Sequence, residues 1–195
     1  MRRFKDYSTN YLDRLGNLFK QIDFEVLEKI AGEIVRAYQE DRTVYVAGNG
    51  GSASTATHMS CDLSKGTVSP IHRRLRVTSL NDNMAWFSAI ANDFAYEDVF
   101  VEQLRTILRK GDVLIAISAS GNSPNVVKAT EFALSLQART IALVGFQGGK
   151  LKQIADLVFH LQGDDYGTVE DAHLILNHML VEYMREFIRT QESAA

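Results

Sequence analysis

The chain has 195 residues, 46% of them hydrophobic and 23% charged, with a formal net charge of −3 at pH 7. This composition is ordinary for a soluble globular protein, and the small negative charge argues against a surface that binds nucleic acid. No run approaches the ~20 apolar residues of a membrane span, and residues 1–20 lack the apolar stretch of a signal peptide. A single cysteine, Cys61, excludes an intrachain disulfide. These features predict a cytoplasmic protein with no membrane partner.

The first 41 residues are predicted to form two helices. Apolar residues recur at helical spacing over residues 4–21 and 24–39, and Asp23 is suited to cap the second helix. From residue 42 onward, predicted strands and helices alternate. The expected strands are 43–47, 76–80, 113–117, 140–144 and 157–161, and the expected helices are 52–64, 83–91, 97–109, one from Pro124, a short one after residue 149, and 168–190.

Two helix starts carry local signals. Pro124 stands where proline is favoured, at the first helical position, and Ser123 before it can cap that helix. Thr168, with Asp171 three residues later, resembles a capping box at the start of the last helix. That helix is apolar on several sides, which predicts that it is buried between subunits.

The central strands define the fold class. Residues 43–47, 113–117 and 140–144 are nearly continuous apolar runs, as in parallel strands that are covered on both faces. Right-handed crossovers would then give an α/β fold with a doubly wound parallel sheet. No linker, repeat or low-complexity stretch interrupts the chain, so residues 1–195 are expected to be one domain, with helices in 1–41 and the α/β core in 42–195.

Two turns rich in glycine and serine follow apolar strands. The first is Gly48-Asn49-Gly50-Gly51-Ser52, and the second runs from Ser118 to Pro124. Neither matches the dinucleotide fingerprint or the Walker loop. Glycines let the backbone approach an anion, and helix N-termini and serine hydroxyls donate hydrogen bonds to it. The turns therefore favour binding of a small phosphorylated ligand over plain strand-to-helix connections. Both follow carboxyl ends of strands, so they could share one pocket.

Histidines and carboxylates in two helices are the candidates for chemistry. His58 and Asp62 share one helix face at i, i+4, and Glu170 and His178 belong to the last helix. The alternatives are an ordinary surface pair for the first two and a buried, hydrogen-bonded histidine for His178. His173 faces elsewhere on the last helix and is expected to be structural.

Three further residues carry weaker signals. Cys61 is expected to be a small buried residue rather than a nucleophile. His72 and His160 have no partner that the sequence reveals.

Several of these residues together resemble a known family. The first turn with His58, the stretch Ala91-Asn92-Asp93 and the serine turn are similar to the SIS (sugar isomerase) fold, and most similar to phosphoheptose isomerases. The resemblance covers nearly the whole chain, including the two N-terminal helices. It implies a flavodoxin-like parallel sheet and a homotetramer with active sites at subunit interfaces.

The resemblance also implies a substrate site. Ser118, Ser120 and Ser123 would hold a sugar phosphate, and Asn49, Ser52 and Asp93 would lie near the sugar. Its complete set of substrate-binding residues is Asn49, Gly50, Gly51, Ser52, Asp93, Ser118, Ser120, Asn122 and Ser123.

The reaction implied by the resemblance is aldose–ketose isomerisation of sedoheptulose 7-phosphate through an enediol. Asp62 and His178 would be the catalytic base and acid, and some members of the family hold Zn²⁺ at the positions of His58, Asp62, Glu170 and His178. Asp62 stands where the family has glutamate, Glu170 where it has glutamine, and Thr168 where it has arginine.

These departures leave alternatives open. The chain could be an isomerase of another phosphosugar, or a non-catalytic SIS protein that binds a phosphosugar or associates with a replication initiator. The retained carboxylate at Asp62 and the retained His178 favour an enzyme. Glu170 and His178 lie ~12 Å apart along one helix, so they share a metal only if their side chains converge or if they serve different subunits.

Overall fold

The computed structural model describes residues 3–69 and 73–192, and its centre is a parallel sheet. Five strands lie in the order β2-β1-β3-β4-β5, and every neighbouring pair is parallel. This order confirms the flavodoxin-like doubly wound sheet, because β1 has β2 on one side and β3 on the other. The strands are β1 (Thr43–Gly48), β2 (Arg76–Ser79), β3 (Val113–Ser118), β4 (Arg139–Val144) and β5 (Leu157–His160).

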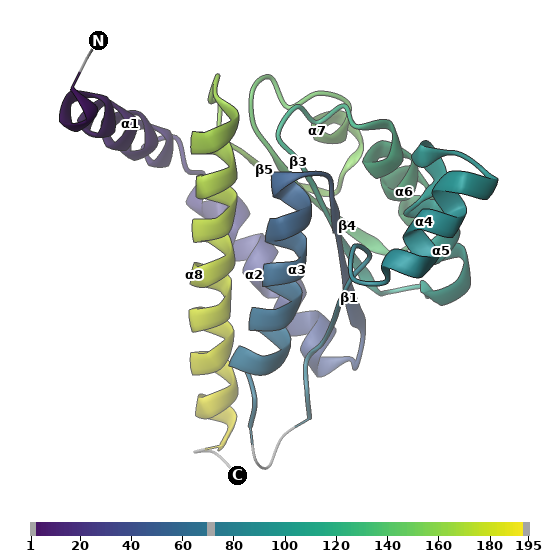
Figure 1. Ribbon diagram of the computed structural model, residues 1–195. Helices are drawn as coiled ribbons and strands as arrows, with labels where there is room; N and C mark the ends of the chain where they lie inside the picture. Colours follow the sequence, from purple (N-terminus) through teal and green to yellow (C-terminus); the bar gives the residue numbers. More distant parts are fainter. Residues whose placement is uncertain (1–2, 70–72, 193–195) are drawn as a thin grey trace.

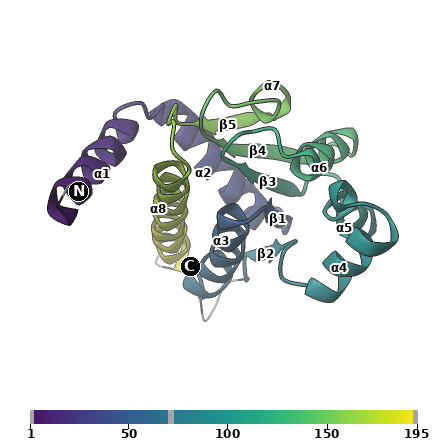
Figure 2. The same ribbon diagram turned by 45° about the horizontal axis from the view of Figure 1, so that its top comes forward.

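Helices cover both faces of the sheet, as the apolar strands predicted (Figure 2). One face carries α2 (Phe24–Gln39), α3 (Gly51–Gly66) and α8 (Tyr166–Glu192). The other face carries α4 (Met84–Asp93), the 3-10 helix η1 (Tyr96–Asp98), α5 (Val101–Ile107), α6 (Pro124–Ser135) and α7 (Leu151–Ile154).

The strand residues divide between two hydrophobic cores. In β3, Ile115 packs with α2, α3 and α8, whereas Leu114 and Ala116 pack with α4, α5 and α6. Side chains of a strand alternate between faces, so a strand covered on both sides must be apolar throughout.

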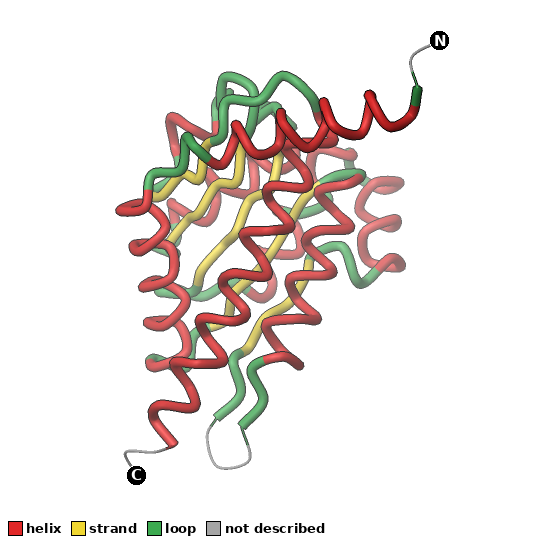
Figure 3. Tube along the Cα trace, turned by 90° about the vertical axis from the view of Figure 1, so that its left-hand side faces the viewer, coloured by secondary structure: helices red, strands yellow, loops and turns green. Residues whose placement is uncertain are grey.

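The first helix, α1 (Phe4–Phe19), lies apart from the sheet. It contacts α8 and lies across one end of the helix layer (Figure 3). Leu18 is its buried residue, whereas Phe4, Tyr7 and Leu12 are exposed. One face of α1 is thus apolar and uncovered within this chain.

The predicted helix starts are confirmed in part. The carboxylate of Asp23 accepts hydrogen bonds from the backbone of Glu25 and Val26, and Pro124 begins α6. Ser123 occupies the cap position of α6 as predicted, but its side chain makes no capping hydrogen bond, and its hydroxyl lies 3.0 Å from the Ser118 hydroxyl. The capping box predicted at Thr168 is wrong.

The last helix begins two residues earlier than predicted, at Tyr166. The Asp165 carboxylate accepts a hydrogen bond from the Thr168 backbone N–H at 3.1 Å, so aspartate supplies the cap. The helix predicted over 97–109 is two elements, η1 and α5. It ends at Ile107 because Leu108 is extended and the Asp112 carboxylate binds the Arg109 backbone N–H. Within the described residues, no helix is both long and apolar enough to cross a bilayer.

Candidate active site

The two predicted ligand turns meet where the strand order reverses. The first turn leaves β1 and the serine turn leaves β3, and these two strands are neighbours in the sheet. Ligands of open parallel sheets bind at this switch point, beyond the carboxyl ends of the strands. A cleft of about 630 Å³ opens there, lined by Gly48, Asn49, Gly50, Ala53, Ser54, Thr57, His58, Cys61, Asn81, Met84, Phe87 and Tyr96.

The first turn is held in an open conformation by its glycines and by Asn81. Gly50 has a φ of 54°, in the left-handed region that glycine adopts readily. The Asn81 side chain accepts a hydrogen bond from the Gly48 backbone N–H at 3.3 Å and donates one to the Gly48 carbonyl at 2.9 Å. The end of β1 is thereby fixed, and α3 begins directly behind it at Gly51.

The serine turn places three hydroxyl groups together. The Ser118 hydroxyl oxygen lies 3.0 Å from that of Ser123 and 3.5 Å from that of Ser120. Ser120 also accepts the backbone N–H of Asn122, whose side chain accepts the Lys150 backbone N–H at 2.9 Å. Hydroxyls beside the N-terminus of α6 are suited to an anion such as phosphate. The lining of the cleft does not include this turn.

A pair of asparagines joins the two turns. Asn49 donates to the Asn125 side chain at 2.8 Å, and Asn125 donates back to Asn49 at 2.9 Å. Tyr96 donates its hydroxyl to the same Asn49 oxygen at 3.0 Å. Neither Asn125 nor Tyr96 was singled out from the sequence. Asn49 and Asn125 are 76 positions apart, so no local sequence pattern indicates that their amides pair.

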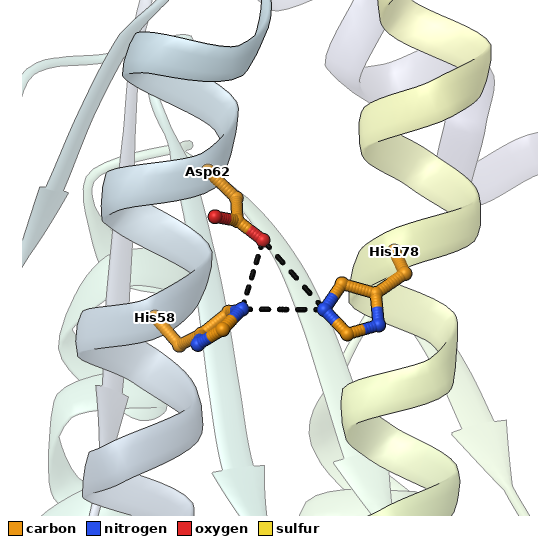
Figure 4. A group of neighbouring side chains, drawn as sticks. All are labelled: His58, Asp62 and His178. Atoms are coloured by element: carbon orange, nitrogen blue, oxygen red, sulfur yellow. Dashed lines mark hydrogen bonds and ion pairs between the residues drawn. The ribbon is translucent and has the colours of Figure 1, made fainter.

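Three of the four predicted metal ligands converge between α3 and α8 (Figure 4). His58 Nε2 lies 2.9 Å from Asp62 Oδ2 and 3.2 Å from His178 Nε2, and His178 Nε2 lies 3.7 Å from Asp62 Oδ2. Ligand atoms about 2.0–2.1 Å from a tetrahedral zinc ion lie about 3.3 Å apart. Two imidazoles and a carboxylate at this spacing therefore fit Zn²⁺ with a fourth position open.

The fourth predicted ligand lies elsewhere. Glu170 is outside this group and sits against the first turn of α3, where a Cβ at Gly51 would be 2.5 Å from the Glu170 carboxyl carbon. Burial raises the pKa of Glu170 above its ordinary value, and the neighbouring Asp171 carboxylate adds to the effect.

The other predicted sugar-binding residues differ in exposure. Ser52 is buried in the first turn of α3. Asp93 is exposed at the end of α4, where it accepts a hydrogen bond from Asn92 at 2.8 Å, and it does not line the cleft.

The histidines and the cysteine differ in their exposure to solvent. His178 is exposed and His173 is fully buried, so the structural role expected for His173 agrees with its position. The prediction that Cys61 is buried is wrong, because it is exposed and lines the cleft. His160 Nε2 lies 3.0 Å from the Phe146 carbonyl, and His72 lies outside the described residues.

Comparisons with known proteins identify the family of the chain. The sequence profile of the SIS domain matches residues 6–145. The chain is 37% identical to a phosphoheptose isomerase of Helicobacter pylori over 158 residues, which are 81% of this chain and 82% of that protein. It is 34% identical to a probable phosphoheptose isomerase of Thermoplasma volcanium over 172 residues, 88% of this chain and 87% of that protein.

The fold gives the same result. The structure of phosphoheptose isomerase GmhA from Neisseria gonorrhoeae matches with a TM-score of 0.86 at 26% identity, covering 94% of this chain and 97% of that one. A phosphoheptose isomerase from Francisella tularensis, 22% identical, has the same fold, with a TM-score of 0.86 over 94% of this chain and 96% of that one. The chain therefore belongs to the phosphoheptose isomerase family of SIS-domain proteins.

Proposed function

We propose that this protein isomerises sedoheptulose 7-phosphate to an aldoheptose 7-phosphate through an enediol. The observation that carries the proposal is the convergence of His58, Asp62 and His178 beside the first turn. Proton transfer between neighbouring carbons needs an acid and a base within reach of one substrate, and this group supplies both.

The serine turn would bind the phosphate group of the substrate. Its three hydroxyls are close enough to contact one phosphate, and hydrogen bonds to a charged group are stronger than those between neutral groups. The sugar would then extend toward the first turn, past Asn49 and Ser52. Asp93, Gly50, Gly51 and Asn122 complete the predicted set.

Asp62 and His178 would move the proton. The carboxylate of Asp62 is suited to removing the proton beside the carbonyl, and the exposed imidazole of His178 is suited to serving the sugar oxygens. Alternatively, His58, Asp62 and His178 would hold Zn²⁺, which would polarise the carbonyl as a Lewis acid, and His178 would then be a ligand rather than the acid. Glu170 as a further ligand stays a prediction.

Assembly and location are predictions of the same proposal. The last helix was predicted to be buried between subunits, but several of its apolar residues, among them Leu176, Leu180 and Met184, are buried in this chain's own core. The exposed apolar face of α1 and the exposed Met179 of α8 support contacts between subunits instead. Light scattering should give a homotetramer, and cell fractionation should place the protein in the cytoplasm.

The decisive experiment is incubation with sedoheptulose 7-phosphate, followed by NMR of the sugar, with added Zn²⁺ and after chelation. Formation of an aldoheptose 7-phosphate that His178→Gln abolishes would support the proposal. Tight binding without turnover would favour the non-catalytic alternative. Turnover of a shorter phosphosugar alone would favour an isomerase of another substrate. The experiment tests both alternatives because Asp62 and Glu170 depart from the residues that the family has at these positions.

A further inference from the structure

A buried amide lies directly behind the candidate metal ligands. Asn177 precedes His178 on α8 and is fully buried. Its Nδ2 donates a hydrogen bond to Asp62 Oδ2 at 3.2 Å, and its Oδ1 has no hydrogen-bond partner among the described residues. Burial of a polar group that is only half satisfied costs stability. A side chain kept there despite that cost points to a role beyond packing.

The surroundings of Asn177 make its polarity conspicuous. Consecutive residues of a helix point ~100° apart, so His178 reaches the exposed side while Asn177 turns toward the core. Its buried neighbours one turn away on the same helix face are His173, Leu180 and Val181. Among the described residues, none of these three forms a hydrogen bond with the amide, whose hydrogen-bond partner is Asp62. The amide is therefore explained by that contact.

Three groups meet at one oxygen of Asp62. His58 Nε2 lies 2.9 Å, Asn177 Nδ2 3.2 Å and His178 Nε2 3.7 Å from Asp62 Oδ2. The two imidazoles approach from the exposed side, and the amide approaches from the core. The two histidines are themselves candidate metal ligands. Asn177 is therefore the one group of the three that can orient Asp62 Oδ2 from outside the candidate metal site.

The direction of the amide fits a negatively charged carboxylate. With Nδ2 toward Asp62, an N–H group meets the charged oxygen, and the interaction is a charge-assisted hydrogen bond. The reversed amide would place its own oxygen against the carboxylate. Groups that hydrogen-bond to a ligating carboxylate orient it and typically change metal affinity or activity 10–100-fold.

We propose that Asn177 is a positioning residue that holds Asp62 Oδ2 between the two imidazoles. Its effect on isomerisation rests on the proposed function, but its effect on the geometry of the site does not. Asp62 is a short side chain on α3 that points into the gap between α3 and α8 (Figure 4). The hydrogen bond from the Asn177 amide ties this carboxylate to α8.

The test compares two leucine variants on the buried side of α8. Asn177→Leu removes the donor and keeps a side chain of similar size. His173→Leu, one turn earlier, removes another fully buried polar side chain but does not contact Asp62, so it is the matched control. Thermal melting of both variants establishes that they fold, and Asn177→Ala replaces the leucine variant if that one does not.

Zn²⁺ affinity is measured by competition with a chromophoric chelator, without sugar. Asn177→Leu should weaken binding by about 10–100-fold, and His173→Leu by less than about twofold. In the isomerase assay, kcat should fall with Asn177→Leu while KM for the sugar phosphate stays within about twofold, because the buried amide does not line the cleft. Equal Zn²⁺ affinity in the parent and Asn177→Leu would overturn the proposal.

A third measurement separates this inference from the proposed function. The imidazole resonances of His58 and His178, recorded by ¹H–¹⁵N NMR on metal-free protein, should shift in Asn177→Leu and stay in place in His173→Leu. If the parent binds no Zn²⁺, these shifts decide the proposal, and unchanged resonances refute it. If the shifts and the Zn²⁺ effect are present but sedoheptulose 7-phosphate is not turned over, the proposed function fails and the positioning role stands.

Discussion

His173 makes the stability of this fold sensitive to acid. Burial lowers the pKa of His173 from 6.5 to about 4, and a backbone contact with Val144 offsets only part of that effect. In the unfolded chain the imidazole regains its ordinary pKa of ~6.5. Between these two pH values the unfolded state is protonated and the folded state is not, so acidification favours unfolding.

The size of this effect follows from the two pKa values. They differ by about 2.5, and each pKa unit is worth about 1.4 kcal/mol. The contribution of neutral His173 is therefore fully present above pH ~6.5 and is lost progressively as the pH falls toward 4. About 3 kcal/mol of the free energy of unfolding should disappear between pH 7 and pH 4 because of this one side chain.

Urea denaturation at a fixed protein concentration, repeated between pH 7 and pH 4, measures the loss. Other groups titrate in the same range, so the informative quantity is the difference between the parent and His173→Leu. The variant should lose about 3 kcal/mol less than the parent. If the curves of His173→Leu and the parent are parallel, the reasoning is wrong.

Three further predictions concern the site. Ser120→Ala should weaken binding of the sugar phosphate by roughly 1.5–3 kcal/mol in calorimetry, because a hydrogen bond to a charged group is lost, and unchanged affinity would contradict the phosphate assignment. Asp62→Asn and His178→Gln should each lower kcat by on the order of a hundredfold or more, and parent-like rates in both would place the chemistry elsewhere. Gly51→Ala should displace the Glu170 carboxyl group, since the added Cβ would lie 2.5 Å from its carboxyl carbon, but the melting temperature should change little because the clash is with the flexible end of that side chain. A large loss of stability that Glu170→Ala reverses would show that Glu170 cannot move.

The fold was predictable from the sequence because its signals are local. A strand such as 113–117 is apolar throughout, and glycines and serines follow it directly, so the parallel sheet and the two turns could be read in order. The errors concerned helix ends, the helix predicted over 97–109, which is two elements, and one helix face. Cys61 was expected to be buried, but it lies on the side of α3 that faces the cleft.

Only two kinds of signal predicted site residues: the spacing of pairs on one helix and the family resemblance. The i, i+4 spacing relates His58 to Asp62, and the resemblance suggested that His178 joins them, 120 positions from His58. Nothing comparable exists for Asn177 or Asn125. Their partners lie on other elements, 115 and 76 positions away, and such contacts are set by how the helices pack.

The reciprocal pairing of Asn49 with Asn125 has a consequence for which molecules this protein can accept. The pair connects α6, which follows the serine turn proposed to bind the phosphate, to the first turn beside the candidate catalytic residues. The distance between these two parts of the site is therefore held fixed. At the proposed site, this spacing would select a sugar by the length of its carbon chain as well as by its hydroxyl groups. Because each amide donates a hydrogen bond to the other, substitution of the buried Asn125 would also release Asn49. Such a change would weaken selection by chain length although Asn125 is far from the imidazoles in sequence.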